Sequence, residues 1–231
     1  MSDVSLPHYL KDGYLPLRDH LLARHVDVRF DYAHCQSRRF PDSPEGFVFE
    51  FAWALLTATR HRAEARPIMD RLAPVLKSGG SLFDQCEPEE AARIEAIRID
   101  RKKRYATARA LVSRDDGPTA LVSFLQTLPG MSGATGYRLA RNLGADVAVP
   151  DASLTALAEP LAKPVQGLCE YVADGTGDRS ASVGLILSRA IEYGLLLPTA
   201  QGPVVAVQEH QAGDLDGRRS VLLGARRGDR P

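Results

Sequence analysis

Residues 128–135, "LPGMSGAT", place a proline, two glycines and a serine between two segments with helical patterning. Gly130 and Gly133 permit positive φ angles and a close approach of another backbone. The amides of residues 131–135 then lie open at the start of a helix, where unpaired N–H groups and the helix dipole favour an anion. Thr135 adds a hydroxyl. The pattern predicts either an anion-binding corner or an ordinary turn between two helices, which any helical protein contains.

The charges around this corner favour the anion-binding interpretation. No acidic residue occurs between Gly117 and Ala145, and Arg138 and Arg141 follow one and two turns into the next helix. An acid-free, glycine-rich corner that is followed by arginines suits a phosphodiester backbone.

A second concentration of positive charge precedes the corner. Between Arg93 and Arg114 the sequence has eight basic residues and two acidic ones, Glu95 and Asp100. The basic residues are Arg93, Arg98, Arg101, Lys102, Lys103, Arg104, Arg109 and Arg114. Such a run is either the solvated face of a helix or part of a one-sided nucleic-acid footprint.

The elements that position these residues are helices, and the predicted class is all-α. Hydrophobic periodicity predicts two helices over 43–76, with a break near Arg60–Ala63. Further helices are predicted over 17–26, 88–97, 100–114, 117–128, 134–144, 151–162 and 179–197. Pro88 suits a helix start and Gly144 a helix end. From about Gly202 the chain is polar and irregular, and residues 204–208 and 219–225 could pair as two short strands.

The composition is that of an ordinary globular chain. The 231 residues suit one large domain or two small ones. Lys+Arg and Asp+Glu both total 29, so only local charge argues for a nucleic-acid partner. Three widely separated cysteines, Cys35, Cys86 and Cys169, argue against a disulfide framework, a zinc ribbon or a four-cysteine iron–sulfur cluster. With no secretory h-region and no membrane-length apolar run, we expect a cytoplasmic monomer without a membrane partner.

Taken in order, these segments resemble the helix–hairpin–helix DNA glycosylases. The segments are "LLTAT", "RKKRYATARAL", "FLQTLPGMSGATGYRLARNLG" and "DVAVPDASL". The resemblance covers about residues 47–195 and is densest over 121–158. The hairpin glycines of the family fall on Gly130 and Gly133, and its essential aspartate falls on Asp151, 21 residues after Gly130.

The resemblance implies two helical lobes that flank a DNA-binding cleft. One lobe is a helical barrel over residues 45–155, with the helix–hairpin–helix at about 121–144. The other combines residues 1–44 with 156–231. The implied partner is double-stranded DNA.

Three departures from the family pattern refine the expected activity. Ser132 stands where the usual LPGxGxxT has its second glycine, which leaves the fold intact. Ala134 stands where strand-cleaving members carry a lysine, so strand cleavage is in doubt. Only Cys169 lies where many members have a four-cysteine loop, which removes the cluster. The resemblance therefore implies a monofunctional glycosylase.

The implied reaction is hydrolysis of an N-glycosidic bond after a base has been flipped out of the stack. Positive charge develops on the sugar, and the Asp151 carboxylate would stabilise it and orient a water. The alternative for Asp151 is a plain N-cap, for which aspartate is a preferred residue. The residues implied to hold the DNA backbone are Gly130, Ser132, Gly133, Thr135, Arg138 and Arg141.

Flipping also needs a wedge and a pocket. The wedge position follows "LLTA", so its candidates are Thr59, Arg60 and His61, which otherwise form a surface turn. Aromatic residues that could stack on a flipped base, or belong to the core, are Trp53, Tyr137, Tyr105 and Phe49. We expect no catalytic metal and no other cofactor, because the histidines and cysteines lack metal-ligand spacing. The resemblance implies a structural monovalent cation on hairpin carbonyls.

The same residues fit other functions. A bifunctional glycosylase and lyase would need a relocated lysine, such as Lys102 or Lys103. A non-catalytic module would use the same hairpin only to bind DNA, and a helical protein unrelated to DNA would use it as a turn. The base that is excised, whether damaged or modified, is not encoded in any of these motifs.

Overall fold

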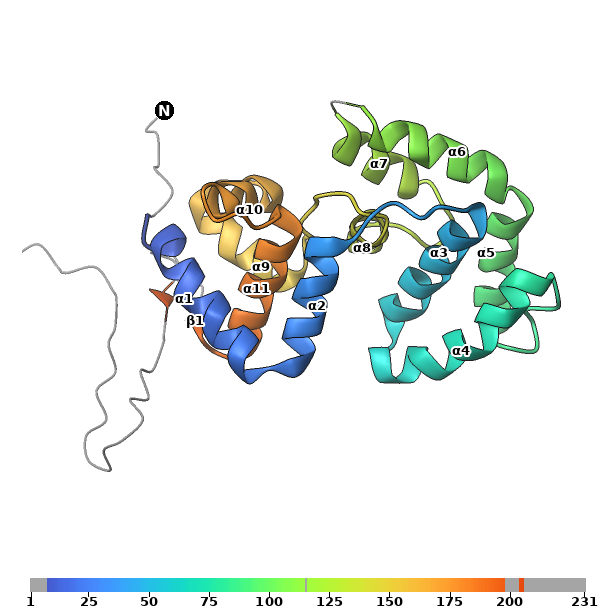
Figure 1. Cartoon of the computed structure of the whole chain (residues 1–231), viewed down its shortest axis with the longest axis horizontal. Coiled ribbons are helices and arrows are strands. Elements are labelled where there is room, and N and C mark those ends of the chain that lie inside the picture. The colour runs from blue at the N-terminus through green and yellow to red at the C-terminus, as the bar shows by residue number, and fades with distance from the viewer. Residues whose placement is uncertain (1–7, 115, 198–203, 206–231) are drawn as a thin grey trace, which may run out of the picture. The chain divides into compact units, whose positions relative to one another are not determined.

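The structure, a computed structural model, describes residues 8–114, 116–197 and 204–205. These residues contain eleven α-helices and one pair of two-residue strands, which confirms the all-α class (Figure 1). The described residues divide into two compact units. The first combines the chain up to Gln36 with the residues from Ala148 on, and the second is Ser37–Val147. The sequence instead predicts boundaries at residues 45 and 155.

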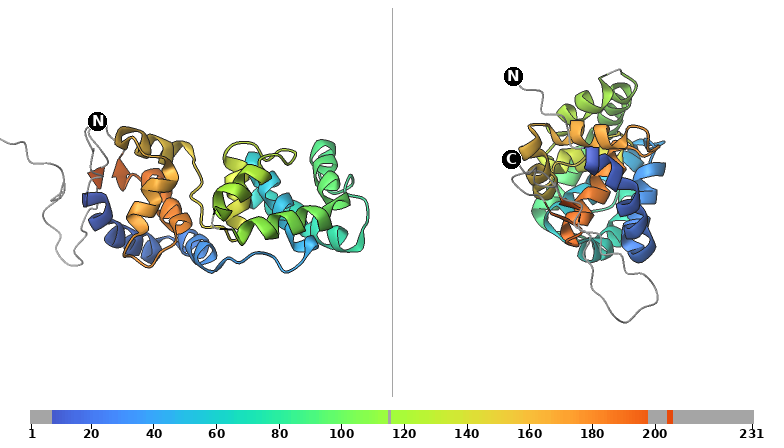
Figure 2. Two further views of the ribbon diagram at one scale, coloured as in Figure 1. Left: turned by 90° about the horizontal axis from the view of Figure 1, so that it is seen from above. Right: turned by 90° about the vertical axis from the view of Figure 1, so that its left-hand side faces the viewer.

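Four α-helices lie wholly within the first unit, and a fifth, α2, ends at its boundary. They are α1 (His8–Arg24), α2 (Val26–Ser37), α9 (Ala152–Ala158), α10 (Val165–Ala173) and α11 (Ser180–Glu192). A 3₁₀ turn, η1 (Glu159–Leu161), continues α9. Helix α11 packs against α1, α9 and α10, as the views of Figure 2 also show. Strand β1 (Leu196–Leu197) pairs antiparallel with β2 (Val204–Val205).

Several sequence predictions for this unit need correction. One short helix was predicted over 17–26, but α1 and α2 are two helices that together span 8–37. Leu10, Tyr14, Leu17 and Leu21 form a buried stripe on α1, which continues through Pro16. Helix α10 was not predicted, although it also buries one face. Residues 204–205 pair with β1, and the predicted partner strand, 219–225, lies outside the described residues.

The second unit is built around one helix that is buried on nearly all sides. Its helices are α3 (Pro44–Thr59), α4 (Arg62–Ser78), α5 (Pro88–Ile99), α6 (Arg101–Val112), α7 (Gly117–Leu125) and α8 (Ala134–Asn142). Helix α3 contacts α4, α5, α6 and α8 (Figure 1). Its buried residues include Phe47, Phe51 and Leu55, and an all-round apolar helix of this kind belongs in a core. The predicted break after α3 and the predicted start of α5 at Pro88 are confirmed.

The end of α8 explains why a glycine stands at position 144. Gly144 has φ +88°, its amide donates to Arg141 O, and Ala145 N donates to Ala140 O. This pair of bonds is the Schellman arrangement. A Cβ at Gly144 would also lie 2.8 Å from the backbone carbon of Arg39. The segment before α3 therefore packs directly on the end of α8.

None of the helices within the described ranges is both long enough and apolar enough to cross a membrane.

Candidate functional site

The corner between α7 and α8 requires both of its predicted glycines. Gly130 has φ +78°, and a Cβ there would lie 2.8 Å from Leu55 Cδ1 and 2.9 Å from Arg93 Nη1. Gly133 has φ +55° and ψ −134°, a region that is essentially restricted to glycine. A Cβ at Gly133 would meet no atom within 4 Å. Gly130 is therefore needed for both conformation and space, and Gly133 for conformation alone.

The backbone of the corner leaves three amides open. Met131 N donates to Leu128 O at 3.1 Å, and Thr135 N donates to Ser132 O at 3.3 Å. Within the described part of the chain, the amides of Ser132, Gly133 and Ala134 have no acceptor, and no side chain caps the start of α8. Ser132 and Gly133 are exposed. The corner therefore presents three neighbouring N–H groups at the N-terminus of a helix.

Gly136 is a third glycine that the packing of the corner requires, and this was not predicted from the sequence. It is buried, and a Cβ there would lie 2.6 Å from Gln126 Cγ and 2.8 Å from Met131 O. The side chain of Gln126 also donates from Nε2 to Gly133 O at 3.2 Å. The first turn of α8 thus packs tightly against the end of α7, and the signal in the sequence was a second glycine three residues after Gly133.

The two arginines of α8 lie against the protein. Arg138 Nη1 donates to Thr57 O at 2.5 Å, in the last turn of α3, where orphan carbonyls favour a cation. Arg141 is half-buried, and its Nε is buried without a hydrogen-bond partner among the described residues. Contact of these arginines with phosphate stays a prediction.

A pocket of about 730 Å³ lies next to the corner, within the second unit. Its lining comes from the end of α3, the segment that begins α5, and the corner itself. These residues are Leu55, Ala58, Thr59, Arg60, Glu87, Pro88, Glu89, Glu90, Arg93, Gly130 and Thr135. The fold thus brings two wedge candidates, Thr59 and Arg60, together with two corner residues, Gly130 and Thr135.

The other wedge and pocket candidates do not line this pocket. His61 is exposed and caps α4, accepting at Nδ1 from Ala63 N at 3.3 Å. Trp53 and Tyr137 are half-buried against the core of the second unit. Their role in base recognition stays a prediction, as does that of the two further aromatics. Tyr105 is buried, with its hydroxyl donating to Pro41 O, and Phe49 is exposed.

Two ion pairs line the pocket. Arg60 binds Glu90, and Arg93 binds Glu89. The hydrogen bond that Arg60 donates to Glu90 raises the pKa of Arg60 above its ordinary value, which keeps the guanidinium charged. The second carboxylate oxygen of Glu90, Oε2, is buried and has no hydrogen-bond partner within the described ranges. In the sequence Glu89 and Glu90 suggested only a helix start.

The basic run of residues 93–114 is largely neutralised by neighbouring acids. Five of its eight members form ion pairs: Arg93–Glu89, Arg98–Glu95, Arg101–Glu45, Arg104–Asp100 and Arg114–Asp116. Lys102 and Lys103 are exposed on α6 and have no ion pair with any described residue. Arg109 donates to the Tyr105 hydroxyl. The basic side chains of this run without an ion pair to a described residue are therefore Lys102, Lys103 and Arg109.

Asp151 lies in the first unit, at the start of α9. Its Oδ1 accepts from Leu154 N at 2.8 Å, so it is the N-cap of this helix. Its Oδ2 accepts from Ser188 Oγ of α11 at 2.6 Å. The residue is half-buried. Both oxygens are held in place, an arrangement that serves a cap and equally an oriented carboxylate.

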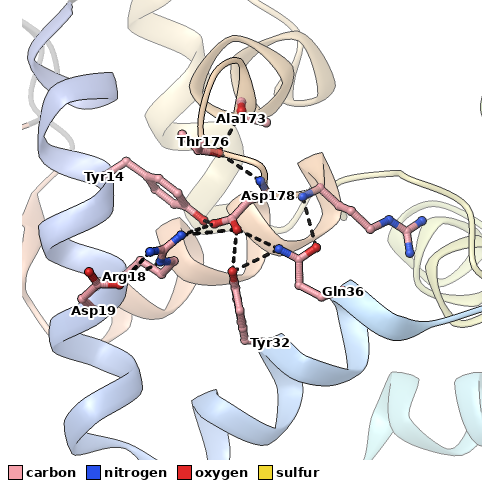
Figure 3. Close-up of polar contacts among 9 residues, drawn as sticks. Tyr14, Arg18, Asp19, Tyr32, Gln36, Ala173, Thr176 and Asp178 are labelled. Atoms are coloured by element: carbon pink, nitrogen blue, oxygen red, sulfur yellow. Dashed lines mark hydrogen bonds and ion pairs between the residues drawn. The ribbon is translucent and has the colours of Figure 1, made fainter.

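A second aspartate in the first unit, Asp178, is the centre of a buried network (Figure 3). It accepts from Tyr14 at 2.6 Å, Tyr32 at 2.5 Å, Gln36 at 2.8 Å and Arg18 at 3.2 Å. Its side chain is 4% exposed. Burial, followed by the bond to Asp178, raises the pKa of both tyrosines. This network ties α1 and α2 to the loop before α11, and no sequence motif indicated it.

Among the described residues there is no group of three or more His, Cys, Asp or Glu arranged to hold a metal ion. The monovalent cation on the hairpin carbonyls stays a prediction.

Comparison of the chain with protein-family models, curated proteins and solved structures gave no match.

Proposed function

We propose that the protein is a monofunctional DNA glycosylase. It binds double-stranded DNA through a helix–hairpin–helix formed by α7, the corner and α8, and it hydrolyses the N-glycosidic bond of a flipped, damaged or modified base. The observation that carries the proposal is the corner, where Gly130 and Gly133 have positive φ and three adjacent amides have no acceptor among the described residues. Such a group of N–H donors at a helix start matches a phosphate.

The DNA contact of the corner is made by backbone atoms in this proposal. The amides of Ser132, Gly133 and Ala134 carry no sequence information, so they would hold any duplex alike. Lys102 and Lys103, exposed on α6, add charge that is not paired with any described acid. The formal net charge of zero is compatible with this, because the positive charge is local.

Asp151 performs the chemistry in this proposal. As the glycosidic bond breaks, positive charge develops on the sugar, and a fixed carboxylate stabilises it and orients the attacking water. The hydrogen bonds from Leu154 N and Ser188 Oγ prevent the carboxylate from rotating away. No amine is available at Ala134 for a Schiff base, so the product is an abasic site in an unbroken strand.

A specific observation favours one competing function. Both oxygens of Asp151 already have donors within the protein, and the bond from Leu154 N alone makes it an ordinary cap. A non-catalytic module would therefore bind DNA through the corner and release no base.

Release of free bases tests the proposal directly. The full chain is incubated with duplexes that carry alkylated, deaminated, oxidised, mismatched or bulky modified bases, and the released bases are identified by mass spectrometry. We expect one class of base to be released, with strands that break only after alkali or heat. Trapping by borohydride would indicate the bifunctional alternative through Lys102 or Lys103. Binding without any release would contradict catalysis and favour the non-catalytic module.

A further inference from the structure

The pocket beside the corner is large enough for a small organic ligand. Its volume of about 730 Å³ lies within the range of roughly 300–1,000 Å³ that is typical of small-molecule sites. All of its lining belongs to the second unit. Leu55, Ala58 and Pro88 provide an apolar surface, and Thr59 and Thr135 provide hydroxyls. This combination suits a flat ring with a polar edge.

The charges of the pocket indicate what that polar edge must carry. Three carboxylates face two guanidinium groups, and each guanidinium is already bound to a carboxylate. One negative charge is left over. A ligand with hydrogen-bond donors is therefore complementary to the pocket, whereas the partial negative charge of a ligand acceptor would be repelled by the carboxylates.

The acceptor in this pocket that lacks a hydrogen-bond donor among the described residues is one oxygen of Glu90. Its side chain is 14% exposed, its Oε1 is held by Arg60, and its Oε2 is buried with no donor from any described residue. A buried acceptor without a partner is costly, because it has lost its water and gained nothing in return. A ligand donor that reaches Oε2 would remove this cost.

Arg60 holds the other oxygen of Glu90, Oε1, through an ion pair. It lies at the break between α3 and α4, where its backbone is extended, and its side chain is 24% exposed.

We infer that this pocket binds a planar ring with an exocyclic amino group, which donates to the Glu90 carboxylate. The ring stacks against the apolar surface of Leu55, Ala58 and Pro88. That the ring is a nucleobase rests on the proposed function, and the demand for an amino group rests on the pocket alone. The class then comprises adenine, cytosine, guanine and their modified forms that keep the amino group.

Titration of the full chain with nucleosides tests this inference. The probes are adenosine against purine riboside and cytidine against 2-pyrimidinone riboside, since each pair differs only in the exocyclic amino group and the ring nitrogens gain no proton. Binding is followed by the amide NMR signals of Ala58, Glu87 and Thr135. We expect adenosine and cytidine to bind roughly tenfold or more tightly than the two nucleosides that lack the amino group, because these leave the carboxylate without a donor.

Two variants sharpen the test. Glu90→Gln keeps the shape and presents both a carbonyl and an amide, so it should bind all four nucleosides about equally. Glu95→Gln is the matched control, because Glu95 is also on α5 and ion-paired, with Arg98, but does not line the pocket. It should keep the wild-type preference. If Glu90→Gln does not fold, the inference is tested by the wild-type chain alone, through its relative affinity for nucleosides with and without the amino group.

Equal binding of the paired nucleosides by the wild type, or no shift of the pocket amides with any of them, would overturn the inference. The titration breaks no bond, so its outcome is separate from that of base release. A chain that selects amino nucleosides but releases no base contradicts the proposed glycosylase and leaves the pocket assignment standing. A chain that releases base but shows no preference contradicts only the pocket assignment.

Discussion

Glu90 in the second unit and Asp178 in the first are both largely buried carboxylates, yet their surroundings differ. Asp178 accepts from four side chains on two helices, and both of its oxygens are satisfied. Glu90, which lines a pocket, has one ion pair, and its second oxygen is buried without a donor from any described residue. A fully bonded buried carboxylate stabilises the fold, whereas an incompletely bonded one beside a cavity indicates a ligand. Asp151, half-buried with two donors, lies between these extremes.

Asp151→Asn should have the largest effect on function. Asparagine keeps the size and the capping ability, so the fold should survive. The negative charge opposite the sugar cation is lost, and base release should slow by a factor on the order of 10²–10⁴. Single-turnover release from the preferred duplex measures this, and Asp174→Asn, at an exposed position, is the control. If a folded Asp151→Asn chain released bases at the wild-type rate, Asp151 would be only the N-cap of α9 and not a catalytic residue.

Asp178→Ala should have the largest effect on stability. It leaves Arg18 and two tyrosine hydroxyls without their shared acceptor, and loss of one partner from a buried ion pair costs about 3–5 kcal/mol. Urea denaturation measures the free energy of unfolding. Glu90→Gln should cost much less, because Glu90 has fewer donors. A loss at Asp178 no greater than at Glu90 would remove the contrast between the two carboxylates.

Substitution of the corner glycines should separate steric from conformational demands. Gly130→Ala adds a clash with Leu55 and Arg93 to the positive φ, and should destabilise by roughly 2–4 kcal/mol. Gly133→Ala meets only conformational strain, about 1–3 kcal/mol. Both should weaken DNA binding, since the open amides move. Equal stability losses at the two positions would show that the contact at Gly130 relaxes freely.

The Asp178 network should also make stability fall at alkaline pH. Tyr14 has an ordinary pKa of 10.0, and burial raises it in the folded state. Its contribution is therefore fully present below pH 10 and is lost as the pH rises further, because only the unfolded chain releases the proton readily. Unfolding measured between pH 8 and pH 11 should show this decline, and Tyr14→Phe should reduce it. Tyr193→Phe, at an exposed residue outside the Asp178 network, is the control and should leave the decline unchanged.

The salt dependence of DNA binding gives the smallest expected effect. Each lost phosphate contact reduces the slope of log K against log salt by about 0.9 on duplex DNA. Arg138→Ala and Arg141→Ala should each do so, alike for all sequences, if they reach phosphate as the sequence predicts. Arg138 is bound to Thr57 O, so Lys102→Ala and Lys103→Ala provide the comparison. A reduced slope only in the lysine variants would locate the DNA contact on α6.

Local patterns were sufficient for most of the second unit. Apolar periodicity predicted its helices, and the break at Arg60, the start at Pro88 and the turn at Gly130 each depend on a few neighbouring residues. Three helices of the first unit were misjudged or missed. Helix α1 runs through Pro16, α2 was not predicted as a separate helix, and α10 is short, so packing rather than pattern decides them.

The sequence by itself determined the all-α class, a glycine corner at positions 130 and 133, and a helix that starts at Asp151, because turns and helix starts depend on a few neighbouring residues. Only the tertiary structure decided which partners the polar groups find. Ser188 reaches Asp151 from 37 residues away, and Tyr14 reaches Asp178 from 164. Glu90, Arg60 and Gly130 likewise meet in one pocket only through packing. Such contacts depend on how helices stack around a core, a property that no single stretch of sequence contains.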